Sequence, residues 1–139
     1  MMKISAKVAN RRGEHSARVQ TGENERTLAI APKQEGLGSS VNGGELLFLA
    51  LATCFCNDIY REAAKRGMEI RGVQVEVTGE FGGEREPARE IRYCASVDAS
   101  ASREAVLDLM RHTDSVAEIH NTIRRGSAVI FSDCEVREL

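Results

Sequence analysis

Hydrophobic and polar residues alternate along the first 30 positions of the chain. Ile4, Ala6 and Val8 share one face of a predicted strand. Ala17 and Val19 mark a second strand, and positions 28 and 30 mark a third. Turn residues that include glycine or asparagine separate the three runs at positions 10–13 and 21–24. Alternation with period two is typical of half-buried strands, so the pattern predicts an antiparallel three-stranded meander.

A longer apolar segment follows a loop rich in glycine and serine. Residues 46–55 contain one polar residue, Thr53. A segment that is apolar on all sides predicts a core helix, and it is too short for the roughly 20 residues that span a bilayer. Asn42 and Glu45 have the spacing of a capping box at the helix start, and Gly67 suits its C-terminal end. We expect the polar second half of this helix, residues 60–66, to reach solvent.

The rest of the chain predicts a hairpin, two helices and a last strand. Residues 73–77 and 91–97 alternate as two strands. Ser100 or Ser102 is expected to cap a helix through His112, and the Ser115–Glu118 spacing predicts a capping box on a short helix that ends near Gly126. Ala128, Ile130 and Cys134 suggest a final strand. The order β-β-β-α-β-β-α-α-β predicts one α+β domain over residues 1–139.

Composition and charge exclude several classes of function. The formal net charge is −2 and no long basic run occurs, so we expect no nucleic-acid partner. The N-terminus lacks the apolar run of a signal peptide, which predicts a cytoplasmic protein with reduced thiols and no membrane partner. Four cysteines, at positions 54, 56, 94 and 134, show no paired CxxC spacing. We therefore expect neither a metal nor a cofactor.

Cys54 is the best candidate for a reactive thiol, although a buried cysteine is also common as simple core packing. Cys56 lies two residues further on. Positions i and i+2 of a helix face different directions, so a disulfide between the two would require local unwinding. Packing is the simpler interpretation of Cys56.

The chain resembles the OsmC/Ohr family of thiol-dependent hydroperoxide reductases. The segment Asn42-Gly-Gly-Glu-Leu-Leu-Phe-Leu-Ala-Leu-Ala-Thr-Cys54 resembles the family's Asn-to-Cys helix, with the same spacing. The segment Glu118-Ile-His-Asn-Thr-Ile123 resembles the family's motif after its second cysteine. The resemblance implies an OsmC-like fold in an intertwined homodimer with two sites at the subunit interface. It also implies a peroxidatic cysteine, a resolving cysteine and an activating Arg–Glu pair.

Applied to this chain, the resemblance assigns the peroxidatic position to Cys54 and implies a pKa below that of a free thiol. The resolving position falls on Ala117, and the position of the catalytic glutamate falls on Gly44. Glu45 could replace that glutamate or serve only as the helix cap. The activating arginine would come from the N-terminal strands, where Arg11, Arg12 and Arg18 stay open as candidates and Arg18 is the one carried into the site.

Ligand contacts are expected from three further positions. They are Cys56, Glu118 and His120, although a capping Glu118 and a surface or helix-end His120 are simpler interpretations. The leading hypothesis is one-Cys reduction of organic hydroperoxides, with a small-molecule substrate and an external thiol as reductant. The alternative is a protein of the same fold that is not a peroxidase. Such a protein would bind a small apolar or acyl ligand, or would carry sulfur on Cys54.

Overall fold

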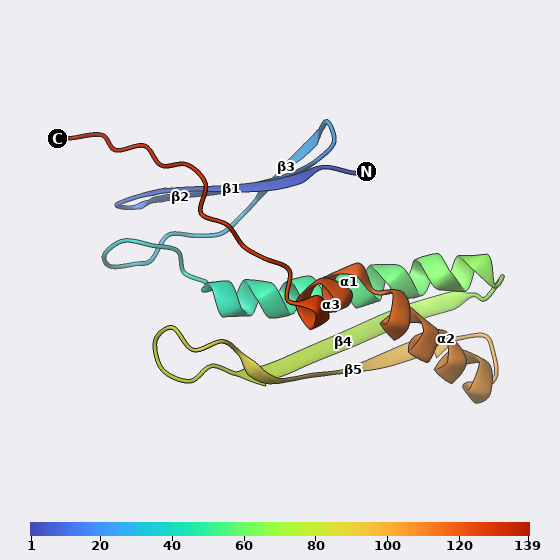
Figure 1. The fold of residues 1–139 in the computed structure, drawn as a ribbon. Coiled ribbons are helices and arrows are strands. Elements are labelled where there is room, and N and C mark those ends of the chain that lie inside the picture. The colour runs from blue at the N-terminus through green and yellow to red at the C-terminus, as the bar shows by residue number, and fades with distance from the viewer. The chain divides into compact units, whose positions relative to one another are not determined.

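The computed structural model describes residues 1–139. The chain has an α+β fold with two antiparallel sheets and three helices, in the order β1-β2-β3-α1-β4-β5-α2-α3 (Figure 1). The predicted fold class is therefore confirmed. The chain divides into two compact units, residues 1–47 and 48–139, which are described separately. The expectation of one domain stays a prediction.

The first unit contains the predicted meander. β1 (Ile4–Arg11), β2 (Glu14–Thr21) and β3 (Asn24–Leu28) pair in that order as antiparallel neighbours. Gly13 and Gly22 have φ angles of +76° and +57° in the two connections, a conformation that glycine adopts without a side-chain clash. The third strand ends at Leu28, two residues before the last position that the alternation predicted.

The long helix α1 (Gly43–Lys65) begins with the predicted capping box. The Asn42 side-chain oxygen accepts a hydrogen bond from the Glu45 backbone N–H at 2.8 Å, and the Glu45 carboxylate accepts one from the Asn42 N–H at 2.9 Å. Each side chain thus satisfies a backbone donor that the helix itself leaves free. Gly67, with φ of +64°, follows the C-terminal end, as predicted.

The second unit is built on a long hairpin. β4 (Ile70–Glu80) pairs with β5 (Arg89–Ala99), and α1 runs along the hairpin (Figure 1). α2 (Arg103–Val116) and α3 (Glu118–Arg125) follow. The core is a cluster of buried apolar side chains from α1 and α2 packed on Val73, Val75, Tyr93, Ala95 and Val97 of the sheet. The cluster consists of Phe55, Ile59, Ala63 and Leu109.

Two local predictions at the C-terminal end are wrong. Ser102 caps α2 as expected, but Ser115 does not cap α3, because α2 continues through Val116 and the Ser115 hydroxyl bonds back to the His112 carbonyl. Ala117, in an extended conformation, stands at the cap position. The predicted final strand at residues 128–134 is absent, since neither sheet contains a neighbour that pairs with it. A strand needs such a partner for its backbone hydrogen bonds.

Burial along α1 is uneven. Leu46, Leu47 and Leu49 are exposed in the single chain, whereas Leu51 and Phe55 of the same apolar run are buried. Glu62, in the half that was expected to reach solvent, is also buried. That local expectation is wrong for Glu62. No helix of the structure has the length and apolar character needed to cross a membrane.

Candidate functional site

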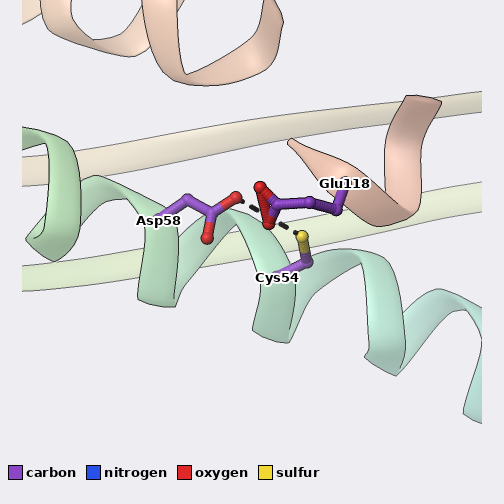
Figure 2. Close-up of side chains that lie close together, drawn as sticks. All are labelled: Cys54, Asp58 and Glu118. Atoms are coloured by element: carbon purple, nitrogen blue, oxygen red, sulfur yellow. Dashed lines mark hydrogen bonds between the residues drawn. The ribbon is translucent and has the colours of Figure 1, made fainter. Parts of the chain in front are cut away.

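The candidate site begins on one face of α1. Cys54, Asp58 and Arg61 follow one another at spacings of four and three residues, which brings their side chains onto neighbouring positions of a helix surface. The Cys54 thiol donates a hydrogen bond to Asp58 Oδ2, with the sulfur and oxygen 3.6 Å apart (Figure 2). Asp58 is only 5% exposed. The proton of the candidate thiol is therefore shared with a buried carboxylate through a hydrogen bond.

Arg61 connects this face of α1 to the start of α3. One guanidinium nitrogen lies 3.2 Å from Asp58 Oδ1, and two donate to the two carboxylate oxygens of Glu118 at 3.3 and 3.2 Å. Such a two-pronged pairing fixes orientation as well as distance. Figure 2 shows the Glu118 side chain reaching from α3 toward Cys54 and Asp58. Arg61 thus brings two carboxylates and one thiol together.

The environment raises the pKa of the Cys54 thiol. Burial is the largest cause, and the charge of Asp58 adds to it because a second negative charge would form beside the first. The backbone N–H of Ile119 acts in the opposite direction and lowers the pKa of the thiol. The sequence analysis expected an arginine to lower the pKa of Cys54. Within this chain that expectation is contradicted, because the thiol is partly buried and the side chain that bonds it is a carboxylate.

The two carboxylates have pKa values that are shifted in opposite directions. Burial and then the charge of Glu118 raise the pKa of Asp58, whereas the hydrogen bond from Arg61 lowers the pKa of Glu118. Asp58 is thus the stronger base of the pair. Since Asp58 also accepts the hydrogen bond from Cys54, it is the group placed to take the thiol proton.

The same donor set has the composition of a metal site. Ligand atoms of Cys54, Asp58 and Glu118 lie within 4.8 Å of one another, and thiolate with carboxylate ligands suits zinc. However, Arg61 lies 3.2 Å from an oxygen of each carboxylate. Its positive charge offsets part of theirs and would repel a cation, so the arrangement favours proton transfer over metal binding.

The other two predicted catalytic residues, Glu45 and Arg18, belong to the first unit. Glu45 is engaged in the capping box at the start of α1, nine residues before Cys54. Arg18 lies on β2 and pairs with Glu25 at 3.2 Å. Catalytic roles for these two residues stay predictions.

Of the predicted ligand-binding residues, only Glu118 lies in the cluster. Cys56 lines a separate surface hollow with Ala52, Thr53, Asn57 and Val75. His120 is 4% exposed, which contradicts the interpretation as a surface histidine. All four cysteines are free, and Cys94 and Cys134 are exposed.

Asp58 and Arg61 are the site residues that the sequence interpretation missed. The spacing of Cys54, Asp58 and Arg61 on a predicted helix was an available signal, since side chains three and four positions apart meet. The pairing of Arg61 with Glu118 had no such signal, because the two residues are 57 positions apart in the chain.

The fold and the site define a small α+β protein in which a half-buried thiol, Cys54, lies beside two carboxylates. The family model for OsmC-like proteins matches residues 36–132, which is more than half of the sequence. The chain therefore belongs to the OsmC-like protein family. No curated protein matches it.

Solved structures show the same fold at low sequence identity. An OsmC-like protein from Mycoplasma pneumoniae is 19% identical, with a TM-score of 0.64 over 89% of this chain and 87% of that one. A hypothetical protein from Aquifex aeolicus is 13% identical, with a TM-score of 0.63 over 91% and 89%. An organic hydroperoxide resistance protein OsmC from Legionella pneumophila is 21% identical, with a TM-score of 0.50 over 88% and 89%.

The raised pKa of Cys54 predicts its alkylation behaviour. The rate of Cys54 alkylation by iodoacetamide should rise with pH through a midpoint above about 8.5, the value for a free thiol. Asp58→Asn should move this midpoint downward, because it removes the negative charge that disfavours the thiolate. Mass spectrometry of timed samples measures the rate for each cysteine separately.

Asp108→Asn is the matched control, since Asp108 is an exposed carboxylate that pairs with Arg66. It should leave the midpoint unchanged. A wild-type midpoint below 8.5 would show that the environment stabilises the thiolate.

Proposed function

We propose that the protein reduces organic hydroperoxides with Cys54 as its single peroxidatic thiol and Asp58 as the proton-transfer group. Membership of the OsmC-like family and the fold shared with an organic hydroperoxide resistance protein support a redox role. The observation that carries the proposal is the hydrogen bond from the Cys54 thiol to the buried Asp58 carboxylate. It supplies a base to a thiol whose raised pKa keeps it protonated at neutral pH.

The reaction can be written with Asp58 moving one proton in both directions. The Cys54 sulfur attacks the terminal oxygen of R–O–O–H while Asp58 takes the thiol proton. The O–O bond breaks, and the leaving R–O⁻ receives that proton from Asp58. The products are R–OH and the sulfenic acid Cys54–S–OH, so that the sulfur is oxidised and the peroxide is reduced.

Return to the thiol requires an external thiol of low molecular mass. Ala117 stands at the position where the family resemblance places the resolving cysteine. Cys94 and Cys134 are exposed and form no disulfide with Cys54 in the chain. One external thiol would form a mixed disulfide with the sulfenic acid and release water. A second would release Cys54–SH and leave as a disulfide.

The backbone around the thiol supports this chemistry. The backbone N–H of Ile119, in the first turn of α3, lowers the pKa of the Cys54 thiol. This donor stabilises the negative charge that develops on sulfur during attack. The pair formed by Arg61 and Glu118 holds the first turn of α3 beside α1, so Arg61 acts as a positioning residue.

We further propose that the protein is a homodimer in the cytoplasm. Leu46, Leu47 and Leu49 form an exposed apolar surface on the first half of α1, and Val129 to Phe131 are exposed in the C-terminal segment. Exposed apolar surfaces of this kind are typical of obligate interfaces. A cytoplasmic location agrees with four free cysteines.

Replacement of Asp58 separates its role as base from its effect on the thiol pKa. Asp58→Asn should slow the reduction of cumene hydroperoxide by 10²-fold or more, the usual range for loss of a general acid–base group. The same variant should react faster with iodoacetamide near neutral pH, because its Cys54 forms a thiolate more readily. Stopped-flow oxidation and alkylation of the same samples measure both rates.

A general loss of structure would lower both rates together, so the opposite signs are the diagnostic result. Asp108→Asn should change neither rate. If Asp58→Asn reduced the peroxide as fast as the wild type, the proposed proton transfer would be excluded.

The redox cycle gives a second prediction. Hydroperoxide added to the reduced protein should yield Cys54 sulfenic acid without an intramolecular disulfide, and excess peroxide should carry it to the sulfinic acid. Ala117→Cys should create a disulfide with Cys54 and protect against that overoxidation. Mass spectrometry distinguishes the products, and a wild-type disulfide on Cys54 would contradict the one-Cys cycle.

The proposed dimer depends on the apolar surface of α1. The wild type should sediment as a dimer at micromolar concentration, and Leu49→Glu should shift it toward monomer because the partner would then bury a charge. Tyr60→Glu is the control, as an exposed residue on the second half of the same helix. Stable wild-type monomer in analytical ultracentrifugation would refute the assembly.

A further inference from the structure

A second cavity lies between α1, β5 and α3 in the larger unit. Its volume is about 150 Å³, and it is lined by Leu51, Ile91, Tyr93, His120, Ile123 and Arg124. Cys54 and Asp58 are not among the lining residues, so the cavity is separate from the thiol cluster. Three aliphatic side chains and one aromatic ring make most of its wall apolar.

His120 is an unusual residue for such a wall. The residue is only 4% exposed, and neither ring nitrogen has a hydrogen-bond partner in the chain. The ring packs edge-on against Tyr93, with the centroids 4.8 Å apart. Burial, and then the charge of Arg124, lower the pKa of His120, so that it is a neutral imidazole with one donor and one acceptor nitrogen.

An unpaired buried donor and acceptor cost free energy that an apolar residue at this position would avoid. Neither nitrogen is open to solvent in this conformation. Since no hydrogen bond holds the ring, a rotation about its Cβ–Cγ bond is the movement that would bring a nitrogen to the cavity. The partner that the imidazole lacks in the protein can then come from a molecule bound there.

The wall defines the chemistry of that molecule. Arg124 pairs with Asp114 at 2.7 Å, so its charge is already balanced and a carboxylate ligand would gain little from it. Leu51, Ile91 and Ile123 favour a hydrocarbon group. A cavity of about 150 Å³ lined by similar side chains holds a benzene-sized molecule, whereas a water needs two to four polar partners.

We propose that this cavity binds an uncharged small molecule of about six heavy atoms that consists of a compact hydrocarbon group and one hydroxyl-type head, with His120 as the hydrogen-bond partner of the head. A hydroxyl can accept from the protonated nitrogen of a neutral imidazole or donate to the unprotonated one, so it can pair with whichever nitrogen faces the cavity. The proposal does not depend on the chemistry of Cys54.

Cyclopentanol is a suitable probe, because it has six heavy atoms and one hydroxyl. Titration of the ¹⁵N-labelled protein should give saturable chemical-shift changes at Leu51, Tyr93 and Ile123, and a shift of the His120 ring nitrogens. Cyclopentanecarboxylate, which adds a negative charge, should bind at least tenfold more weakly.

Two variants test the site from different sides. Ile123→Phe fills the cavity and should weaken cyclopentanol binding at least tenfold, while Ile119→Phe, on the same helix with the same 36% exposure, should retain it. His120→Phe removes the polar partner and should weaken binding about fivefold, which corresponds to one hydrogen bond of about 1 kcal/mol. It should leave the unliganded protein at least as stable.

Three results would contradict the proposed binding site. Shifts that do not saturate up to the solubility of cyclopentanol would overturn the proposal, and so would binding that survives both Ile123→Phe and His120→Phe. Equal binding of the alcohol and the carboxylate would refute the uncharged ligand class.

Discussion

The interaction on which the candidate site depends is the contact of Arg61 with Asp58 and Glu118. Two carboxylates within 4.8 Å of a thiol would otherwise repel each other, by about 4 kcal/mol at 4 Å in an environment of effective dielectric about 20. The guanidinium offsets this repulsion and, through its two bonds to Glu118, ties α1 to α3. Arg61 is partly exposed, so its ion pairs position the neighbouring side chains more than they add to the free energy of unfolding. The helix spacing brings Asp58 beside Cys54, and the pairing of Arg61 with Glu118 brings the first turn of α3 to the same place.

Local sequence signals predicted most of the elements. The capping box of α1 and the Ser102 cap of α2 depend on residues three positions apart, and the strands show period-two patterns; the structure confirms all of these. The Ser115 capping box had the same spacing but failed, because α2 extends past it. The final strand failed for a different reason. Alternation in residues 128–134 describes a side-chain pattern, but a strand also requires a neighbour, which the chain does not supply.

The site was less predictable than the fold, and the reason is the distance in sequence between its parts. The position of Cys54 was predicted from the family resemblance. The group that contacts Cys54 was not, because Asp58 was not considered and the pairing of Arg61 with Glu118 joins residues 57 positions apart in the chain. The burial of His120 could not be inferred either, since a polar residue on a short helix is more often exposed. Tertiary packing decided each of these outcomes.

The short helix α3 links the thiol cluster and the second cavity. Eight residues are too few for a stable isolated helix, so α3 depends on its tertiary contacts. Glu118 anchors its first turn to Arg61, and Arg124 anchors its last turn to Asp114. Between these anchors, the Ile119 N–H lowers the pKa of the Cys54 thiol and the neighbouring His120 ring lines the cavity. A molecule that turns the His120 ring would therefore act on the helix that positions the thiolate donor, which gives the two sites a physical route for coupling through one element.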